Sequence, residues 1–152
     1  MSLKDAEMTD LTAIQDPEVR SLADEAAAFL EGQPWCDRVL SGKVGFAIPG
    51  VLGVFLLQLQ PSRVGVDHAL WVVTGDLPSA YLVCDSAPDW REALARYTEE
   101  MGRWVKAVRA GESLEGVIPV SAAATQQNAD LLARRLQYIS TEFVNVGPEF
   151  EQ

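Results

Sequence analysis

The residues best suited to chemistry lie in one stretch, Asp67 to Asp85, which contains the only histidine of this 152-residue chain and one of its two cysteines. If this stretch folds as a hairpin centred near Leu77, the numbers of any two residues that face each other across the strands sum to about 153 to 155. Asp67 and His68 then lie opposite Cys84 and Asp85. Nucleophilic catalysis needs such a set, with a thiol beside a base and a third group that orients the base. Cys84, His68 and Asp85 are therefore the candidate catalytic residues of a small thiol-dependent enzyme.

The same residues also fit a purely structural interpretation, which we favour. Cys84 ends an apolar strand, where a cysteine behaves as a small hydrophobe. His68 begins a strand, and Asp85 precedes a helix, where carboxylates serve as caps. A register slip of one residue would put His68 and Cys84 on opposite faces of the hairpin. We therefore lean against an enzyme and leave that alternative open.

Cofactor and metal motifs are missing from the sequence. Cys36 and Cys84 lie 48 positions apart without a C-x-x-C pair, and a zinc site built from cysteine and histidine would lack ligands. The tripeptide at residues 41–43 ends like a phosphate-binding loop, but the rest of that motif is absent. We expect no cofactor and no metal. Two isolated cysteines fit a reducing cytoplasm.

The charge of the chain bears on its partners. Its 22 acidic and 12 basic residues give a net charge of −10, which disfavours binding to nucleic acid or to an anionic membrane. We expect either a basic protein partner or a charge that serves solubility alone. Asp24 and Glu25, on an exposed helix face, and Trp35, in a loop, are the candidate partner contacts.

The N-terminus has no apolar segment of the kind found in a signal peptide. The most apolar run, residues 44–59, is interrupted by Pro49 and three glycines and is shorter than the roughly 20 residues of a membrane helix. We expect a soluble, cytoplasmic protein.

Hydrophobic spacing and capping residues predict three helices and four strands. The first helix follows Asp16 and Pro17 and ends at Gly32, which we expect in a left-handed conformation. The second begins near Pro88, with Ser86 as its cap, and ends at Gly111. The third covers about 122–143. Strands are expected at 43–48, 51–60, 69–74 and 80–85, with a further edge strand at 116–120.

These elements predict an α+β fold. Its small antiparallel sheet has three to four strands, and about three helices pack mainly on one face. We expect one domain over residues 1–152, with about 1–15 and 145–152 flexible. Because residues 51–62 are apolar and lack lysine, we place them at a sheet edge and expect a homodimer that covers this strand or the apolar stripe of the second helix.

The run ALWVVTGDLPSAYL, residues 69–82, is followed by a helix with the pattern W-x-x-A-L-x-x-Y at Trp90, Leu94 and Tyr97. In these features the chain resembles a family of small bacterial proteins of unknown function. The resemblance covers roughly residues 69–139. It implies a bacterial cytosolic protein and supplies no catalytic residue.

The sequence identifies no specific activity. The interpretation that fits best is a non-catalytic protein-binding module, immunity-like or regulatory, with a basic partner. The alternative is the thiol-dependent enzyme that uses Cys84, His68 and Asp85.

Overall fold

The structure, a computed structural model, describes residues 8–120 and 122–144. It divides into two compact units, residues 1–93 and 94–152, and the boundary falls just after the first turn of helix α3. The predicted α+β class is confirmed, since the described residues form a five-stranded antiparallel sheet and three α-helices. That the whole chain is one domain stays a prediction. Of the ends that we predicted to be flexible, residues 1–7 and 145–152 lie outside the described residues, whereas residues 9–13 form a short strand and a 3-10 helix.

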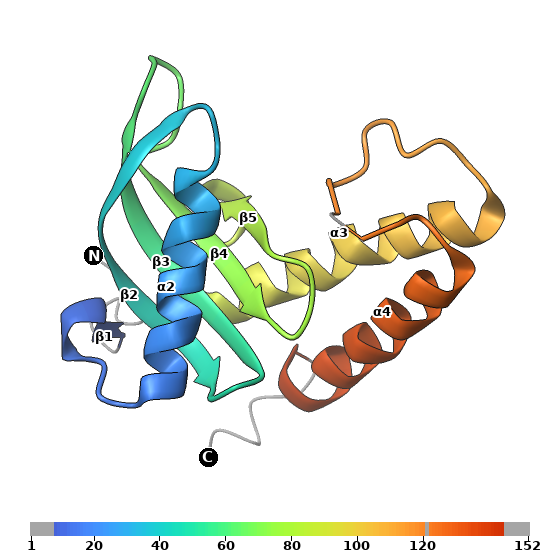
Figure 1. Ribbon diagram of the computed structural model, residues 1–152, viewed down its shortest axis with the longest axis horizontal. Coiled ribbons are helices and arrows are strands. Elements are labelled where there is room, and N and C mark those ends of the chain that lie inside the picture. Colours follow the sequence, from blue (N-terminus) through green and yellow to red (C-terminus); the bar gives the residue numbers. More distant parts are fainter. Residues whose placement is uncertain (1–7, 121, 145–152) are drawn as a thin grey trace. The chain divides into compact units, whose positions relative to one another are not determined.

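The sheet of the first unit has its strands in chain order, each antiparallel to the next (Figure 1). The strands are β1 (Thr9–Asp10), β2 (Cys36–Ile48), β3 (Leu52–Pro61), β4 (Ala69–Gly75) and β5 (Ala80–Val83).

The predicted count of three to four strands was wrong. The sequence analysis missed β1, whose two polar residues are too few to show an alternating pattern, and it began β2 seven residues late, at Lys43. The predicted edge strand at 116–120 does not form. The placement of residues 51–62 at a sheet edge was also wrong, because β3 lies in the centre, between β2 and β4.

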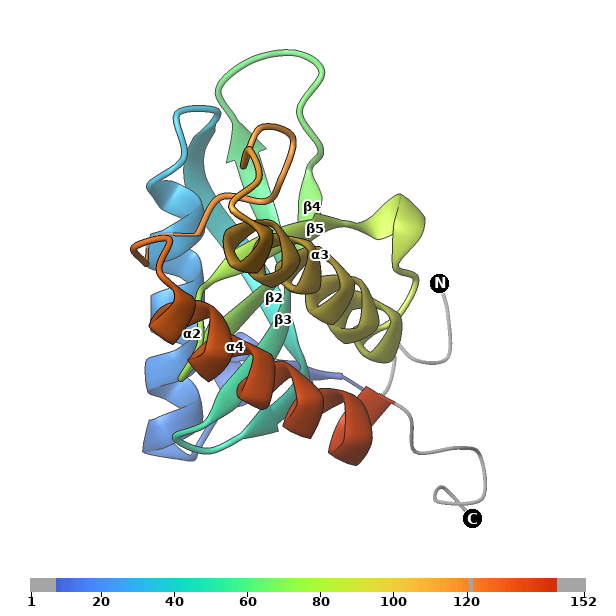
Figure 2. The same ribbon diagram turned by 90° about the vertical axis from the view of Figure 1, so that its right-hand side faces the viewer.

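Helix α2 (Pro17–Glu31) lies along one face of this sheet (Figures 1 and 2). As predicted, Asp16 caps it, and its Oδ1 accepts the N–H groups of Glu18 and Val19. Gly32 ends the helix in a right-handed conformation, with φ −76°, so the left-handed conformation that we predicted was wrong. The core beneath α2 is formed by buried side chains from the helix and from strands β2, β3 and β4, namely Leu22, Ala23, Ala26, Leu30, Cys36, Phe55, Leu57, Leu59, Leu70 and Val72.

The opposite face of the sheet is also apolar and buried. Trp71 and Leu82 are paired residues on this face, and the Trp71 Nε1–H donates to the Ala87 carbonyl at 2.7 Å. The indole of Trp90, at the start of α3, stacks on Phe46 with ring centroids 4.3 Å apart. The first turn of α3 therefore lies on the face that α2 leaves uncovered, and the prediction that the helices pack mainly on one face does not hold within this unit.

The second unit is helical. Helices α3 (Trp90–Ala110) and α4 (Gln126–Ile139) lie side by side and run in opposite directions (Figures 1 and 2), and the short π-helix η3 (Ser140–Val144) follows α4. Asp89 caps α3 by accepting the Glu92 N–H at 2.9 Å. The side chain of Ser86, the predicted cap, lies outside the described residues. As predicted, Gly111 follows the last turn of α3 with φ +67°. The apolar stripes of the two helices are buried, at Leu94, Tyr97, Met101, Trp104, Val105, Ala129, Leu132, Leu136 and Ile139.

Two short 3-10 helices complete the described elements, η1 (Leu11–Ala13) and η2 (Cys84–Ser86). Among the described residues, no helix combines the length and the apolar character that a membrane crossing requires.

Candidate functional site

The hairpin of β4 and β5 brings together the predicted catalytic residues much as the sequence analysis expected. Paired residues in the two strands, such as Leu70 with Val83 and Trp71 with Leu82, have numbers that sum to 153. This register puts Cys84 beside Ala69, and the Cys84 Sγ–H donates to the Ala69 carbonyl at 3.6 Å. The Cys84 thiol is therefore already engaged by the backbone of the neighbouring strand.

The surroundings of Cys84 do not activate it. Burial and the negative charges of Asp67 and Asp85 raise the pKa of its thiol, which keeps the sulfur protonated near neutral pH. His68 is exposed, and no hydrogen bond or ion pair joins it to Cys84 within the described part of the chain. The three residues thus lie at one end of the hairpin without the contact between thiol and base that nucleophilic catalysis requires.

The second cysteine has a similar environment. Cys36 is buried in the core beneath α2, and burial together with the carboxylates of Glu31 and Asp37 raises the pKa of its thiol. Both cysteines are free thiols. In residues 8–120 and 122–144, no group of histidine, cysteine, aspartate and glutamate side chains has the arrangement that would hold a metal ion.

Trp35 lies in the turn between α2 and β2, in a loop as predicted. Its ring meets that of Tyr81 edge to face, with centroids 5.0 Å apart and planes at 73°. The ring of Phe29, from α2, lies 6.4 Å from Tyr81 on the same face of the sheet. We call Phe29, Trp35 and Tyr81 the aromatic cluster. It joins the end of α2, the loop after it and strand β5.

The aromatic cluster is only partly covered. Phe29 and Trp35 are half-buried against the core, and 38% of Tyr81 is exposed. Partly exposed tyrosine and tryptophan rings that rest on a packed core are the commonest anchors of protein–protein interfaces, because they offer a large contact area with few rotatable bonds. The cluster therefore has the composition of a contact surface for another protein.

Negative charge is concentrated in the unit that carries this cluster. The first unit has 14 acidic and 6 basic residues, and the second has 8 and 6. Asp24 and Glu25, the predicted partner contacts on α2, are exposed, and Glu25 lies one helical turn before Phe29. The first unit, which we call the sheet unit, therefore carries most of the net charge of −10.

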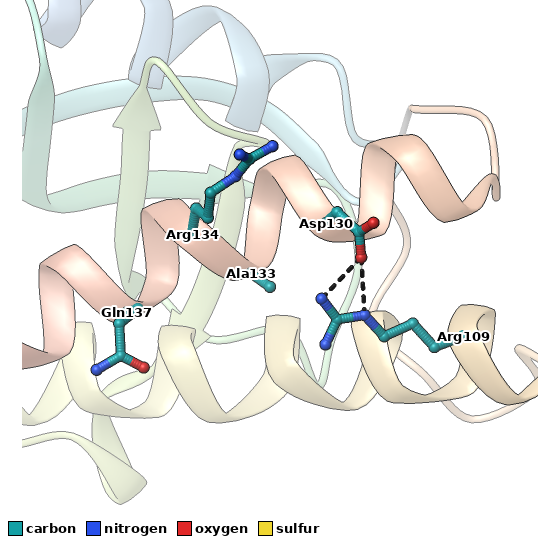
Figure 3. Close-up of a pocket in the computed structure, with 5 residues that line it drawn as sticks. All are labelled: Arg109, Asp130, Ala133, Arg134 and Gln137. Atoms are coloured by element: carbon teal, nitrogen blue, oxygen red, sulfur yellow. Dashed lines mark hydrogen bonds and ion pairs between the residues drawn. The ribbon is translucent and has the colours of Figure 1, made fainter.

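The helical unit has a shallow depression of about 460 Å³ lined by Arg109, Asp130, Ala133, Arg134 and Gln137 (Figure 3). The Arg109 guanidinium donates to Asp130 Oδ1 through Nε at 3.1 Å and Nη2 at 2.8 Å. The Arg109 and Gln126 hydrogen bonds and the positive charges of Arg109 and Arg134 lower the pKa of the Asp130 carboxyl. Because the Asp130 carboxylate already accepts hydrogen bonds from Arg109 and Gln126, the charged groups of the depression are engaged with one another.

Comparisons with known proteins do not extend this description. No family model matches the chain, and neither a curated protein nor a solved structure shows significant similarity to it. The candidate site therefore has to be judged on its own geometry.

Sequence reasoning identified Trp35 but missed the two aromatic residues beside it. Phe29 belongs to the apolar stripe of α2, and a residue of such a stripe is expected in the core. Tyr81 lies in a strand whose residues alternate between buried and exposed. The available signal for Tyr81 was an aromatic residue at an outward position of an alternating strand, next to a hairpin turn.

Proposed function

We propose that this chain is a non-catalytic protein-binding module, immunity-like or regulatory in kind, whose sheet unit takes a basic protein partner. The observation that carries the proposal is the partly exposed aromatic cluster on the unit that holds most of the negative charge. Aromatic side chains supply anchoring area, and complementary charge raises the rate of encounter and selects the partner.

The alternative, a thiol-dependent enzyme using Cys84, His68 and Asp85, has weaker support. Its thiol has a raised pKa, donates a hydrogen bond to a backbone carbonyl and has no hydrogen bond to the His68 ring in the described residues. The depression in the helical unit is remote in sequence from these three residues and offers no nucleophile of its own.

The free thiols of Cys36 and Cys84 are those expected in a reducing cytoplasm. The resemblance to small bacterial proteins of unknown function agrees with that location and assigns no activity. Self-association stays a prediction, but the two features on which we based it, β3 and the apolar stripe of α3, are respectively central in the sheet and buried.

The proposal is tested by capture with a tagged full-length chain from its native cell at low and high salt. We expect a basic protein that is retained at low salt and released at high salt, because screening weakens attraction between exposed charges. The double variant Asp24→Lys/Glu25→Lys should lose much of this capture. The matched control Glu112→Lys/Glu115→Lys, which makes the same change in charge in the helical unit, should keep it.

The enzyme alternative is tested with the same material. Cys84→Ser and His68→Ala should capture the partner as well as the unaltered chain does. The proposal fails if these two variants lose the partner while the charge-reversed variants keep it, or if the captured protein is acidic.

A further inference from the structure

Two adjoining depressions form a groove along the seam between α3 and α4, within the helical unit. The depression described above shares Ala133 and Gln137 with a second one of about 280 Å³, which continues toward Thr98 and Ser140. Figure 3 shows both shared residues on the side of α4 that faces α3. From Thr98 to Arg109 the groove follows about 16 Å of α3, at roughly 1.5 Å per residue. It is therefore long enough for about three turns of a docked helix.

The residues that line the groove have the spacing that receives a further helix. On α3 they recur at steps of four, three and four residues, at Thr98, Gly102, Val105 and Arg109. On α4 they recur at steps of three, four and three residues, at Asp130, Ala133, Gln137 and Ser140. The other lining residues, Glu99, Arg134 and Leu136, each directly adjoin one of these positions. This is the heptad spacing at which one helix offers holes to the side chains of another.

Gly102 lies at the centre of this groove, and no steric contact of the described residues requires a glycine there. A Cβ at this position would meet nothing within 4 Å, and glycine in the middle of a helix is destabilising relative to alanine. Ala133 lies across the seam, and the buried side chains of Val105 and Leu136 are the apolar part of the lining. Two small residues beside buried apolar ones leave a hole that a large apolar side chain of another helix can fill.

The flanks of the groove are basic, in contrast to the chain as a whole. From residue 94 onward, α3 and α4 together carry six basic and three acidic residues. Lys106 directly follows Val105 and Arg134 directly follows Ala133, at the flanking positions whose charges select partners in coiled coils. Both are exposed, and within the described part of the chain neither forms a hydrogen bond or an ion pair.

The acidic residues that line the groove are already paired with arginines of the same unit. Glu99 lies 3.2 Å from Arg96, and Asp130 accepts hydrogen bonds from Arg109. The charges of Lys106 and Arg134 are thus in excess of the acids beside them. An occupant with carboxylates along its flanks would complement the groove.

We infer that the groove between α3 and α4 docks an acidic amphipathic helix of another protein. A large apolar side chain of that helix is seated on Gly102 and Ala133, and its carboxylates face Lys106 and Arg134. The groove belongs to a different unit from the aromatic cluster and takes an acidic partner, whereas the proposed function gives the cluster a basic one.

The test is an NMR titration of the full chain with a synthetic helical peptide of about three heptads, with leucine at the seam positions, glutamate at the flanking positions and alanine elsewhere. We expect the amide signals of Gly102, Val105, Ala133 and Gln137 to move. A peptide with lysine in place of glutamate should not bind, because it meets basic flanks. A peptide with a central proline keeps the negative charge but cannot form a continuous helix, so it should not bind either.

A variant that fills the hole locates the docked side chain. Gly102→Leu should weaken binding of the glutamate peptide by about tenfold or more, as the loss of an interface anchor does. The open space at Gly102 allows the fold to accept the leucine. The matched control Ala28→Leu, at an exposed helical position of the sheet unit, should leave binding unchanged.

A pair of double variants tests the charges. Lys106→Glu/Arg134→Glu should weaken binding several-fold at low salt, and high salt should reduce the difference. Arg38→Glu/Arg63→Glu makes the same change in net charge at exposed arginines of the sheet unit and should have little effect.

Several results would overturn helix docking in this groove. They are a failure of the glutamate peptide to bind, equal binding of the proline peptide, and binding that Gly102→Leu does not weaken. Groove signals that change with protein concentration alone would show that a second copy occupies the groove. Groove signals that change on deletion of residues 145–152 would show that this segment does, and either result also overturns the inference. The capture of a basic protein by the sheet unit is tested separately, through Asp24→Lys/Glu25→Lys.

Discussion

The two units of this chain differ in how their charged residues are paired and in how far their apolar residues are exposed. In the helical unit, arginines are matched by acids close by, as Arg96 is by Glu99 at 3.2 Å and Arg109 is by Asp130 at 2.8 Å. The sheet unit instead has a large surplus of acids and keeps an aromatic cluster partly exposed. A net charge of −10 is therefore a poor description of either unit, and the binding surface that we propose for a basic partner lies in the sheet unit.

The difference also extends to packing. Both faces of the sheet carry buried apolar residues, and small residues permit close approach there, since a Cβ at Gly45 would lie 2.8 Å from the Trp90 Cβ. A Cβ at Gly102, in the middle of α3, would meet nothing within 4 Å. The sheet unit is thus the less tolerant of added volume, and this contrast can be tested by substitution.

The largest effect is expected at Trp71, which is 2% exposed in the centre of the sheet unit. Trp71→Ala should lower the free energy of unfolding by about 3–5 kcal/mol in a urea melt, through lost burial and the cavity left behind. Tyr138→Ala, at an exposed site in the helical unit, should cost less than about 1 kcal/mol. A loss under about 1 kcal/mol for Trp71→Ala would contradict the sheet packing described above.

A pair of glycine substitutions sharpens the comparison. Gly45→Ala should destabilise the chain by about 1–3 kcal/mol, because the new methyl group meets Trp90 and Trp71 in a packed core. Gly102→Ala should stabilise it by about 0.5–1 kcal/mol, because alanine restricts the unfolded chain and has open space in the helix. Thermal or urea unfolding gives the change in the free energy of unfolding for each variant. Changes of the same sign in both variants would remove the contrast between the units.

Sequence patterns predicted the helices and the four longer strands because these elements are specified locally. Asp16 and Gly111 mark helix ends, and β3 and β4 show alternating or continuous apolar residues. Strand order depends on pairings between distant residues, so the central position of β3 could not be read from its composition. The polar first half of β2 shows no strand period, because bulges interrupt its alternation.

The candidate site was predictable in part. The hairpin register that puts Cys84 beside Ala69 followed from the length of the turn. The aromatic cluster did not, because Phe29, Trp35 and Tyr81 come from three separate elements that only the packing of α2 on the sheet brings together.

The reactivity of Cys84 separates the binding module from the enzyme. Because burial, Asp67 and Asp85 raise the pKa of this thiol, its alkylation by iodoacetamide should be slow near neutral pH and should rise only at a pH above that of an ordinary cysteine. Asp85→Asn removes a negative charge, so it should move the profile to lower pH. The measurement uses a Cys36→Ala background. Rapid labelling near neutral pH that slows in His68→Ala would favour the enzyme.

The most direct test of the central claim, that the sheet unit carries the binding surface proposed for a basic partner, is the rate at which the captured basic protein associates with two charge-reversed chains. At low salt, Asp24→Lys/Glu25→Lys should slow association several-fold, while its unfolding free energy stays within about 0.5 kcal/mol of the unaltered chain. Glu112→Lys/Glu115→Lys should change the rate little, and high salt should remove the difference. Equal slowing by both variants, or slowing by the helical-unit variant alone, would contradict the account.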